Sequence, residues 1–379
     1  RVFSTGLPRL KSICSSWLRR LMLLLLPCSW LLSSKPQEVF EGTSKAVLNF
    51  NDSGSSIMEI SHRRADAQEV LDTTIALTKE LLSIPDTHEV IFLQGGASLQ
   101  FSMVPFNLMK NNNGKAAYLE TGVSAKKAIK EAKRLGEVVI PASSSDKNFN
   151  YIPKDYTVPE DVDYFHCTSN NTIYGTQMKS FPESSVPMVC DMSSDILSKK
   201  IDVSKFDVIY AGAQKNMGPA GSVAVIINKE VLGKTGRDIP SYLNYQTHID
   251  KGSAFNTWPV LAVYGVYLNL KWLKNLGGIP TISEINQAKA KLIYDEIDRN
   301  PMFIGTAEKE DRSEMNVCFV LEDESLKEAF DKMWKDAGIV NLNGHRDVGG
   351  YRASIYNAMP IESVQVLVDV MKHFEQKLG

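Results

Sequence analysis

Three features that could do chemistry follow directly after short apolar stretches of this sequence. Lys215 follows "FDVIYAGAQ", Asp191 follows "VPMVC", and Gly95 follows "VIFLQ". If these stretches are strands of one open α/β sheet, the three positions meet where such sheets bind ligands, beyond the carboxyl ends of the strands. A lysine held away from water there has a lowered pKa, which makes its amine a competent nucleophile.

The other two features complement an amine nucleophile. A carboxylate such as that of Asp191 can pair with a protonated ring nitrogen, and a glycine turn that opens a helix presents backbone N–H groups to a phosphate. An amine, a carboxylate and a phosphate cup are together what pyridoxal 5'-phosphate requires. Each also has a plainer interpretation, Lys215 as a turn lysine and Asp191 as a helix cap, and spacing alone leaves both interpretations open.

The elements that would position these residues alternate along the chain. Helical periodicity or helix-start signals predict helices within 36–50, 65–84, 124–136 and 260–278, and apolar β-rich runs predict strands within 88–94, 116–122, 137–143, 162–175, 186–194, 206–216 and 221–233. This alternation is typical of a mainly parallel sheet covered by helices on both faces. We therefore predict an α/β fold, with a large domain over residues 36–280 and a smaller α+β domain over 281–379.

Composition narrows the class of protein. The 379 residues carry a net charge of -2, which gives no electrostatic reason to expect nucleic acid or a membrane as partner. The five cysteines include no C-x-x-C pair, so we expect reduced thiols and a cytoplasmic location. The six histidines show no metal-ligand spacing, and we predict no metal site.

Residues 1–35 differ from the rest of the chain. They contain six basic residues and no acidic ones, and their apolar stretch at 21–32 is too short to cross a bilayer. A secretory signal, an organellar transit segment and a non-native terminus all fit this composition. We treat the segment as an atypical leader and leave the three interpretations open.

Five longer motifs narrow the function. They are "MEISHR" (58–63), "FLQGGASLQF" (92–101), "CDMSSDILSKKIDVSKFDVIYAGAQKNMGPAG" (190–221), "FNTWP" (255–259) and "GHRDVGGYRASIYNAMP" (344–360). From Pro36 onward the chain resembles the phosphoserine aminotransferases, class V members of the fold-type I pyridoxal phosphate enzymes. The resemblance implies the fold of those enzymes, with a large cofactor-binding domain and a small C-terminal domain.

The resemblance implies roles around the cofactor. Lys215 matches the lysine that forms the Schiff base and then shuttles a proton, Asp191 the partner of the pyridine nitrogen, and Thr172 the threonine near the phenolic oxygen. The matched phosphate cup comprises Gly96, Ala97, Ser98, Gln214, Asn256 and Thr257. In the family the Asn-Thr pair comes from the other subunit, which implies an obligate homodimer with shared active sites.

The implied substrates are small anions. The resemblance implies ping-pong amino transfer between glutamate and 3-phosphohydroxypyruvate, giving O-phospho-L-serine and 2-oxoglutarate in serine biosynthesis, with 4-phosphohydroxythreonine as a further substrate. Arg352 matches the residue that holds the α-carboxylate, for which a guanidinium fork is well shaped. The group matched to the distal phosphate or carboxylate comprises His62, Arg63, His345 and Arg346.

The chain departs from the family pattern in three places. Ser124 stands where the family has a tryptophan stacked on the pyridoxal ring, and Ala97 stands where a third glycine is common. The family's N-F-x-x-G-P-A-x-L-P opening has no counterpart before Pro36. Two alternatives to phosphoserine aminotransferase therefore stay open, a weakened paralogue that acts as a dimeric scaffold and a serine–glyoxylate type transaminase.

Overall fold

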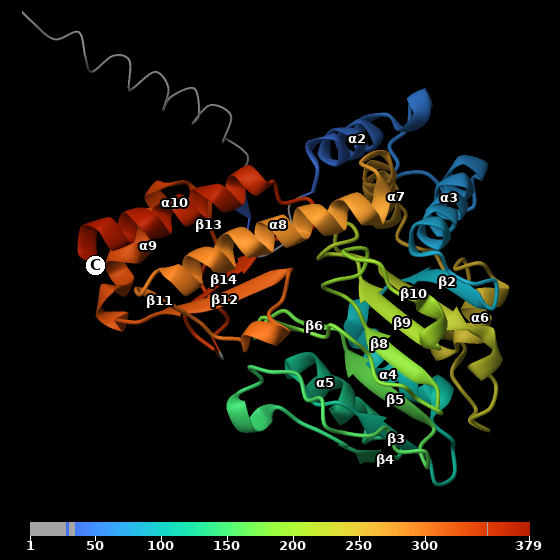
Figure 1. Ribbon diagram of the computed structural model, residues 1–379. Coiled ribbons are helices and arrows are strands. Elements are labelled where there is room, and N and C mark those ends of the chain that lie inside the picture. The colour runs from blue at the N-terminus through green and yellow to red at the C-terminus, as the bar shows by residue number, and fades with distance from the viewer. Residues whose placement is uncertain (1–27, 30–34, 347) are drawn as a thin grey trace, which may run out of the picture.

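The largest element of the fold is a seven-stranded sheet, in a computed structural model that describes residues 28–29, 35–346 and 348–379. Its strand order is β2-β10-β9-β8-β5-β3-β4 (Figure 1). The strands are β2 (His88–Leu93), β3 (Lys115–Tyr118), β4 (Glu137–Val139), β5 (Tyr164–Thr168), β8 (Met188–Asp191), β9 (Val208–Gly212) and β10 (Val223–Asn228). All neighbours pair in parallel except β10, which is antiparallel to both β2 and β9. The prediction of a mainly parallel sheet is confirmed.

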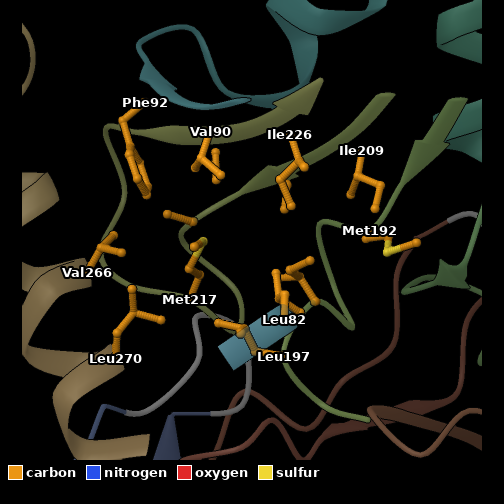
Figure 2. Close-up of a cluster of buried hydrophobic side chains, with 14 of the residues drawn as sticks. Leu82, Val90, Phe92, Met192, Leu197, Ile209, Met217, Ile226, Val266 and Leu270 are labelled. Atoms are coloured by element: carbon orange, nitrogen blue, oxygen red, sulfur yellow. The ribbon is translucent and has the colours of Figure 1, made fainter. Parts of the chain in front are cut away.

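Helices cover both faces of this sheet. One face packs against α3 (Ala65–Leu82) and α7 (Val260–Asn275). Helix α2 (Gln37–Leu48) packs against α7. The other face packs against α4 (Gly96–Leu108) and α5 (Val123–Ala132). Successive strand residues point to opposite faces, so β2 sends Val90 and Phe92 to one core and Ile91 and Leu93 to the other. Figure 2 shows the first of these cores, with Phe92 and Val90 facing Val266 of α7.

A smaller sheet lies towards the C-terminus. It is ordered β11-β12-β14 and antiparallel, with strands β11 (Phe303–Gly305), β12 (Asn316–Leu321) and β14 (Tyr351–Ser354). A third apolar core forms between this sheet and three helices, α8 (Gly278–Arg299), α9 (Lys327–Asp336) and α10 (Ile361–Leu378). Ile279 and Ile282 of α8 belong to the first core and Ile293 to the third, so this helix runs between the two. The domain boundary at residue 280 stays a prediction.

The remaining elements are short. Two pairs of strands stand apart from these sheets, namely β1 (Cys28–Ser29) with β13 (Ile339–Val340) and β6 (Asn170–Asn171) with β7 (Thr176–Gln177). One further α-helix is α6 (Tyr245–Asp250). Most of the predicted leader lies outside the described residues, and the cytoplasmic location stays a prediction. None of the described helices combines the length and the apolar character that a membrane crossing needs.

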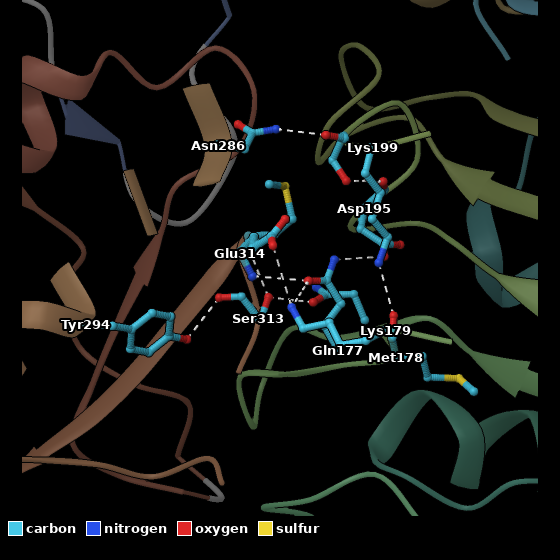
Figure 3. A network of polar contacts seen from close by, with 12 residues as sticks. Gln177, Met178, Lys179, Asp195, Lys199, Asn286, Tyr294, Ser313 and Glu314 are labelled. Carbon is cyan, nitrogen blue, oxygen red and sulfur yellow. Dashed lines mark hydrogen bonds and ion pairs between the residues drawn. The ribbon is translucent and has the colours of Figure 1, made fainter. Parts of the chain in front are cut away.

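Polar contacts join the two sheet regions. Figure 3 shows that Gln177 lies at the centre of these contacts. Its side-chain oxygen accepts the backbone N–H of Glu314 at 3.2 Å, and its nitrogen donates to Asp195 at 3.1 Å. Nearby, Asn286 of α8 donates to the carbonyl of Ser198 at 3.3 Å. Each of these contacts satisfies a buried polar group, so separating the two regions would leave several groups unpaired.

Lys289 of α8 is fully buried in the same region. Its Nζ donates to the carbonyl oxygens of Ile355 at 3.0 Å and Tyr356 at 2.7 Å, and it lies 3.5 Å from that of Asn357. Burial lowers the pKa of Lys289 to about 7. The side chain of Lys289 therefore binds the backbone that follows β14, and burial at this place favours the neutral form of its amine.

We predict that replacing Lys289 by methionine changes stability in a pH-dependent way. The unfolded chain holds this proton up to about pH 10.5, whereas the folded protein releases it near pH 7. Between these pH values the unfolded state binds more protons than the folded state, so the free energy of unfolding of the unmodified protein should rise with pH. Lys289→Met lacks this contribution. The difference in the free energy of unfolding between the two proteins should therefore change by about 2 kcal/mol from pH 7 to 9, in favour of the unmodified protein. Urea unfolding of both proteins at the two pH values measures this change.

The matched control is Lys291→Met, which removes an exposed lysine on the same helix that pairs with Asp295. Its difference from the unmodified protein should be nearly constant between pH 7 and 9. An equally constant difference for Lys289→Met would mean that Lys289 keeps its proton in the fold.

Candidate active site

Lys215 lies in the loop after β9, where its amine is held by one side chain from another strand. Its Nζ lies 2.7 Å from Oγ1 of Thr172, in the loop after β6. Burial lowers the pKa of Lys215, and the positive charge of Arg352 acts in the same direction, whereas Asp191 opposes them. The amine is therefore displaced towards its neutral, nucleophilic form.

Asp191 ends β8, the strand beside β9, and is buried. Its Oδ1 accepts hydrogen bonds from the backbone N–H of Ser193 at 3.0 Å and from the Ser193 hydroxyl at 2.6 Å. Burial raises the pKa of this carboxyl, and the two bonds from Ser193 act against that rise. Thr168 stands opposite Asp191 in β5, and its Oγ1 is buried without a hydrogen-bond partner among the described residues. A polar ligand beside Asp191 would satisfy this orphaned atom.

The glycine turn after β2 opens α4, as the sequence predicts. Gly95 has φ +83° and Gly96 has φ +56°, and the helix begins at Gly96. Its first-turn N–H groups, which include those of Ala97 and Ser98, have no acceptor within the helix and are available to an anion. A Cβ at Gly95 would lie 2.6 Å from Cβ of Leu99, so only glycine fits this turn.

Two further predicted phosphate ligands lie near strand ends. The Gln214 side chain folds over Gly212, the last residue of β9. The carbonyl of Thr257, next to Asn256, accepts a hydrogen bond of 2.5 Å from Gln94, which follows β2. The segment 256–257 of this protomer is therefore tied to the strand end that leads into the glycine turn.

Arg352 reaches the site from β14 of the smaller sheet. It is 8% exposed, and its Nε is buried without a hydrogen-bond partner among the described residues. Within the same part of the chain it forms no ion pair with a carboxylate, yet its charge influences Lys215 and Tyr356. A buried guanidinium with an unused N–H is prepared for an anionic ligand, for which bidentate geometry is favourable.

Other predicted residues lie on loops or at a helix start. His62 and Arg63 precede α3, with Arg63 exposed and Nε2 of His62 buried without a hydrogen-bond partner among the described residues. His345 and Arg346 lie between β13 and β14, in a loop closed by a 2.8 Å bond from Gly344 N–H to the Gly350 carbonyl. Ser124 is in the first turn of α5. The amine of Lys215 contacts Thr172, and the charges of Asp191 and Arg352 act on it.

The structure adds residues that the sequence did not single out. Tyr356 is buried, and Asn316 of β12 donates to its hydroxyl at 3.2 Å. Tyr356 lies within the motif at 344–360, so that motif could have drawn attention to it, whereas Asn316 carries no such signal. Lys35 donates to the carbonyl of Lys215 at 3.1 Å, and burial lowers the pKa of Lys35 to about 7.

Comparisons with known proteins identify the family of the chain. The family model described as "Aminotransferase class-V" matches residues 32–367. A phosphoserine aminotransferase of Flavobacterium psychrophilum is 61% identical over 344 residues, which are 90% of this chain and 96% of that protein. The solved phosphoserine aminotransferase of Bacillus circulans subsp. alkalophilus superposes with a TM-score of 0.88 at 42% identity, over 91% of this chain and 97% of that one.

A second solved structure bears on the cofactor. It is the pyridoxal phosphate-bound phosphoserine aminotransferase of Trichomonas vaginalis, with a TM-score of 0.85 and 34% identity over 89% of this chain and 97% of that one.

We predict that Gly95→Ala weakens anion binding at the start of α4. The added Cβ would meet Leu99 and would sit at positive φ, so the turn must change shape. The affinity for pyridoxal phosphate should fall by about tenfold, because one strained turn costs about 1–3 kcal/mol. An absorbance titration with the cofactor measures this affinity.

Gly54→Ala is the control, because Gly54 has φ +77° with no atom within 4 Å of its added Cβ. It carries a similar backbone strain away from this turn and should bind the cofactor as the unmodified protein does. Unchanged binding in Gly95→Ala would show that the phosphate does not use this helix start.

Proposed function

The chain belongs to the class V aminotransferases, and we propose that within that family it acts as a phosphoserine aminotransferase that uses pyridoxal phosphate. The reaction would move an amino group from glutamate to 3-phosphohydroxypyruvate, giving O-phospho-L-serine and 2-oxoglutarate, and 4-phosphohydroxythreonine would be a related substrate. The observation that carries the proposal is the group formed by the half-buried Lys215 and Thr172 with the buried Asp191 and Arg352. An amine, a hydroxyl, a carboxylate and a guanidinium at one strand edge supply the functions that amino transfer needs.

The described residues fit the cofactor. Asp191 would hold the ring nitrogen, and the orphaned hydroxyl of Thr168 beside it marks a place where a polar partner is lacking. The N–H groups at Gly96, Ala97 and Ser98 would hold the phosphate, with the side chain of Gln214 as a further donor. When bound, pyridoxal phosphate supplies an electron sink for the carbanion formed at the substrate's α-carbon.

Proton transfer and the orientation of the substrate would fall to the chain's own residues. Lys215 in its neutral form takes the proton from the α-carbon as a general base and returns it as a general acid, helped by a pKa that burial has lowered. Thr172 holds the amine in place at 2.7 Å. Arg352 orients the α-carboxylate of either substrate, and burial of its unpaired Nε strengthens that contact.

Recognition of the distal anion would fall to the loop residues. His62, Arg63, His345 and Arg346 all carry basic side chains, and two of them, Arg63 and Arg346, are exposed. A phosphate and a carboxylate are both anions that such side chains bind, so one pocket can serve phosphoserine and glutamate in turn. No observation favours a glyoxylate-type specificity over this one.

The test of the proposed function is turnover together with the cofactor spectrum. The purified chain with pyridoxal phosphate should show a visible absorption band that glutamate bleaches, and it should release 2-oxoglutarate when 3-phosphohydroxypyruvate is present. Lys215→Ala should lose the band and about 10²–10⁴-fold of the turnover, because it removes both nucleophile and base.

Lys205→Ala provides the matched control, since Lys205 is a surface lysine paired with Glu183. It should leave the band and the turnover unchanged. A chain that shows no band would favour the dimeric scaffold, and amino transfer to glyoxylate instead of 3-phosphohydroxypyruvate would favour the serine–glyoxylate class.

We also propose a homodimer with shared active sites. Large apolar side chains are exposed beside the residues expected to cross between subunits: Met58 is 66% exposed near His62 and Arg63, and Phe255 is 38% exposed next to Asn256. A subunit contact over these positions would cover both side chains. A two-fold axis there would let each protomer complete the other's site.

Complementation tests the sharing directly. If Arg63 serves the partner's Lys215, a mixed dimer of Arg63→Ala and Lys215→Ala subunits contains one intact site. Random reassembly of the two inactive variants should then restore about a quarter of the unmodified activity, because half the dimers are mixed and each has one site. No gain over the separate variants would mean that Arg63 acts within its own protomer or that no dimer forms, and sedimentation separates these two results.

A further inference from the structure

Lys35 contacts the loop that carries Lys215, although it lies 180 residues earlier in the chain. Its Nζ donates a hydrogen bond of 3.1 Å to the backbone carbonyl of Lys215. Within the part of the chain that the structure describes, no second donor reaches this carbonyl. Lys35 is half-buried, so the contact is made by a side chain that is partly withdrawn from water.

The next two carbonyls of the loop are held by a different side chain. Asn269 of α7 donates to the carbonyl of Met217 at 3.0 Å, and its Nδ2 lies 3.5 Å from the carbonyl of Asn216. The three successive carbonyls of residues 215–217 therefore each face a side-chain donor from outside the loop. Within the loop, the N–H groups of Met217 and Gly218 turn back to the carbonyl of Ala213, at 3.1 and 2.7 Å.

The side chain of Asn216 ties the same loop to two further segments of the chain. It donates to the carbonyl of Ile196 at 2.6 Å and accepts the backbone N–H of Asn357 at 2.9 Å. The residue after Lys215 is thus fixed through its side chain as well as its backbone. For the backbone of Lys215 itself, the side-chain contact from outside the loop is the one with Lys35.

The start of α2 places Lys35 beside this loop. A residue before proline prefers an extended backbone, which keeps Lys35 out of the helix that Pro36 precedes. The N–H of Val39 donates to the carbonyl of Pro36 at 2.9 Å, and the side chain of Val39 is buried. Helix α2 packs against α7, the helix that carries Asn269 (Figure 1). The two outside donors to the loop therefore depend on one pair of packed helices.

We propose that Lys35 is a positioning residue for Lys215, whose backbone it holds in the place from which the amine reaches a bound cofactor. This role rests on the proposed function, in which the amine attacks the aldehyde of pyridoxal phosphate. In that attack the nitrogen forms a C=N bond with the aldehyde carbon, and the aldehyde oxygen leaves as water. The rate of such a step depends on position, because a displacement of about 1 Å can cost about 100-fold.

Two measurements on the full-length, cofactor-free chain separate positioning from cofactor binding. The first is the rate at which the visible band appears after pyridoxal phosphate is added, which reports the attack by Lys215. The second is the affinity for pyridoxine 5'-phosphate, which lacks the aldehyde and binds without that attack. In Lys35→Met the rate should fall by about tenfold, because the amine is less well placed. The affinity should stay within about twofold, since the N–H groups at the start of α4 are untouched.

Backbone hydrogen exchange tests the hold on the loop directly. The N–H groups of Met217 and Gly218 are protected by their bonds to the carbonyl of Ala213. In Lys35→Met their exchange should become about tenfold faster, because the loop opens more easily once an outside donor is lost. This measurement needs no cofactor, so its result does not depend on the proposed function.

Two variants accompany Lys35→Met. Lys35→Arg keeps a long side chain with N–H donors, so it should recover most of the lost rate and of the lost protection. Lys45→Met removes an exposed lysine of α2, the helix that follows Lys35, and should leave all three measurements unchanged.

The possible results are distinct. An unmodified chain that develops no band with pyridoxal phosphate would overturn the proposed function itself, and hydrogen exchange would still decide whether Lys35 holds the loop. A band rate and an exchange rate that are unchanged in Lys35→Met would overturn this inference alone. Equal losses of band rate and of pyridoxine 5'-phosphate affinity would also contradict it, because Lys35 would then shape the whole cofactor site.

Discussion

One constraint governs the rest of this structure: the amine of Lys215 must be kept from water and yet remain reactive. Burial favours its neutral form, and Arg352 adds to this effect, while Asp191 draws it back towards the ammonium. Two anions, Asp191 and Asp195, thus oppose the effect of burial and of the cation Arg352, and the net result is a lowered pKa of the amine. A lysine on the surface would be charged at neutral pH.

This balance requires residues from both sheets. The large sheet supplies Lys215 and Asp191 from neighbouring parallel strands, and the smaller sheet supplies Arg352. The relative position of the two sheets therefore sets the charge on the amine as well as the place of a bound carboxylate. Contacts such as Gln177 with Glu314, and the clasp of Lys289 on the chain after β14, fix that position. They are distant from the amine but decide what surrounds it.

Sequence reasoning found the parts of the site that lie at strand ends. Lys215, Asp191 and Gly95 were predictable because apolar runs end there and strand ends converge in α/β folds. The antiparallel course of β10 between β2 and β9 was not, because an apolar run does not reveal its direction in a sheet. The expected roles of the loop residues stay predictions, since they depend on ligands and on a partner subunit.

Asn316 and Lys289 could not have been found in this way. Their partners are far away in the sequence: Asn170 is 146 residues from Asn316, and Ile355 is 66 residues from Lys289. A lysine within a helix and an asparagine at the start of a strand usually face water, so the sequence suggests exposed positions. Only the packing of α8 against the chain that follows β14, and of β12 against the segment at Asn170, turns these polar side chains inward, where each must find partners.

The free energy of cofactor binding also depends on Ser124, which stands where the family has a tryptophan. A missing aromatic stack costs about 0.5–1.5 kcal/mol, which is about tenfold in cofactor affinity or less. The start of α4, the carboxylate of Asp191 and the amine of Lys215 are all present, and in the proposed function each would contribute separately to cofactor binding. A scaffold, by contrast, would gain nothing from the buried guanidinium of Arg352, whose Nε has no hydrogen-bond partner among the described residues, because such a group destabilises the folded state unless a ligand meets it. The arrangement is therefore better explained by an enzyme than by a fold that has lost its chemistry.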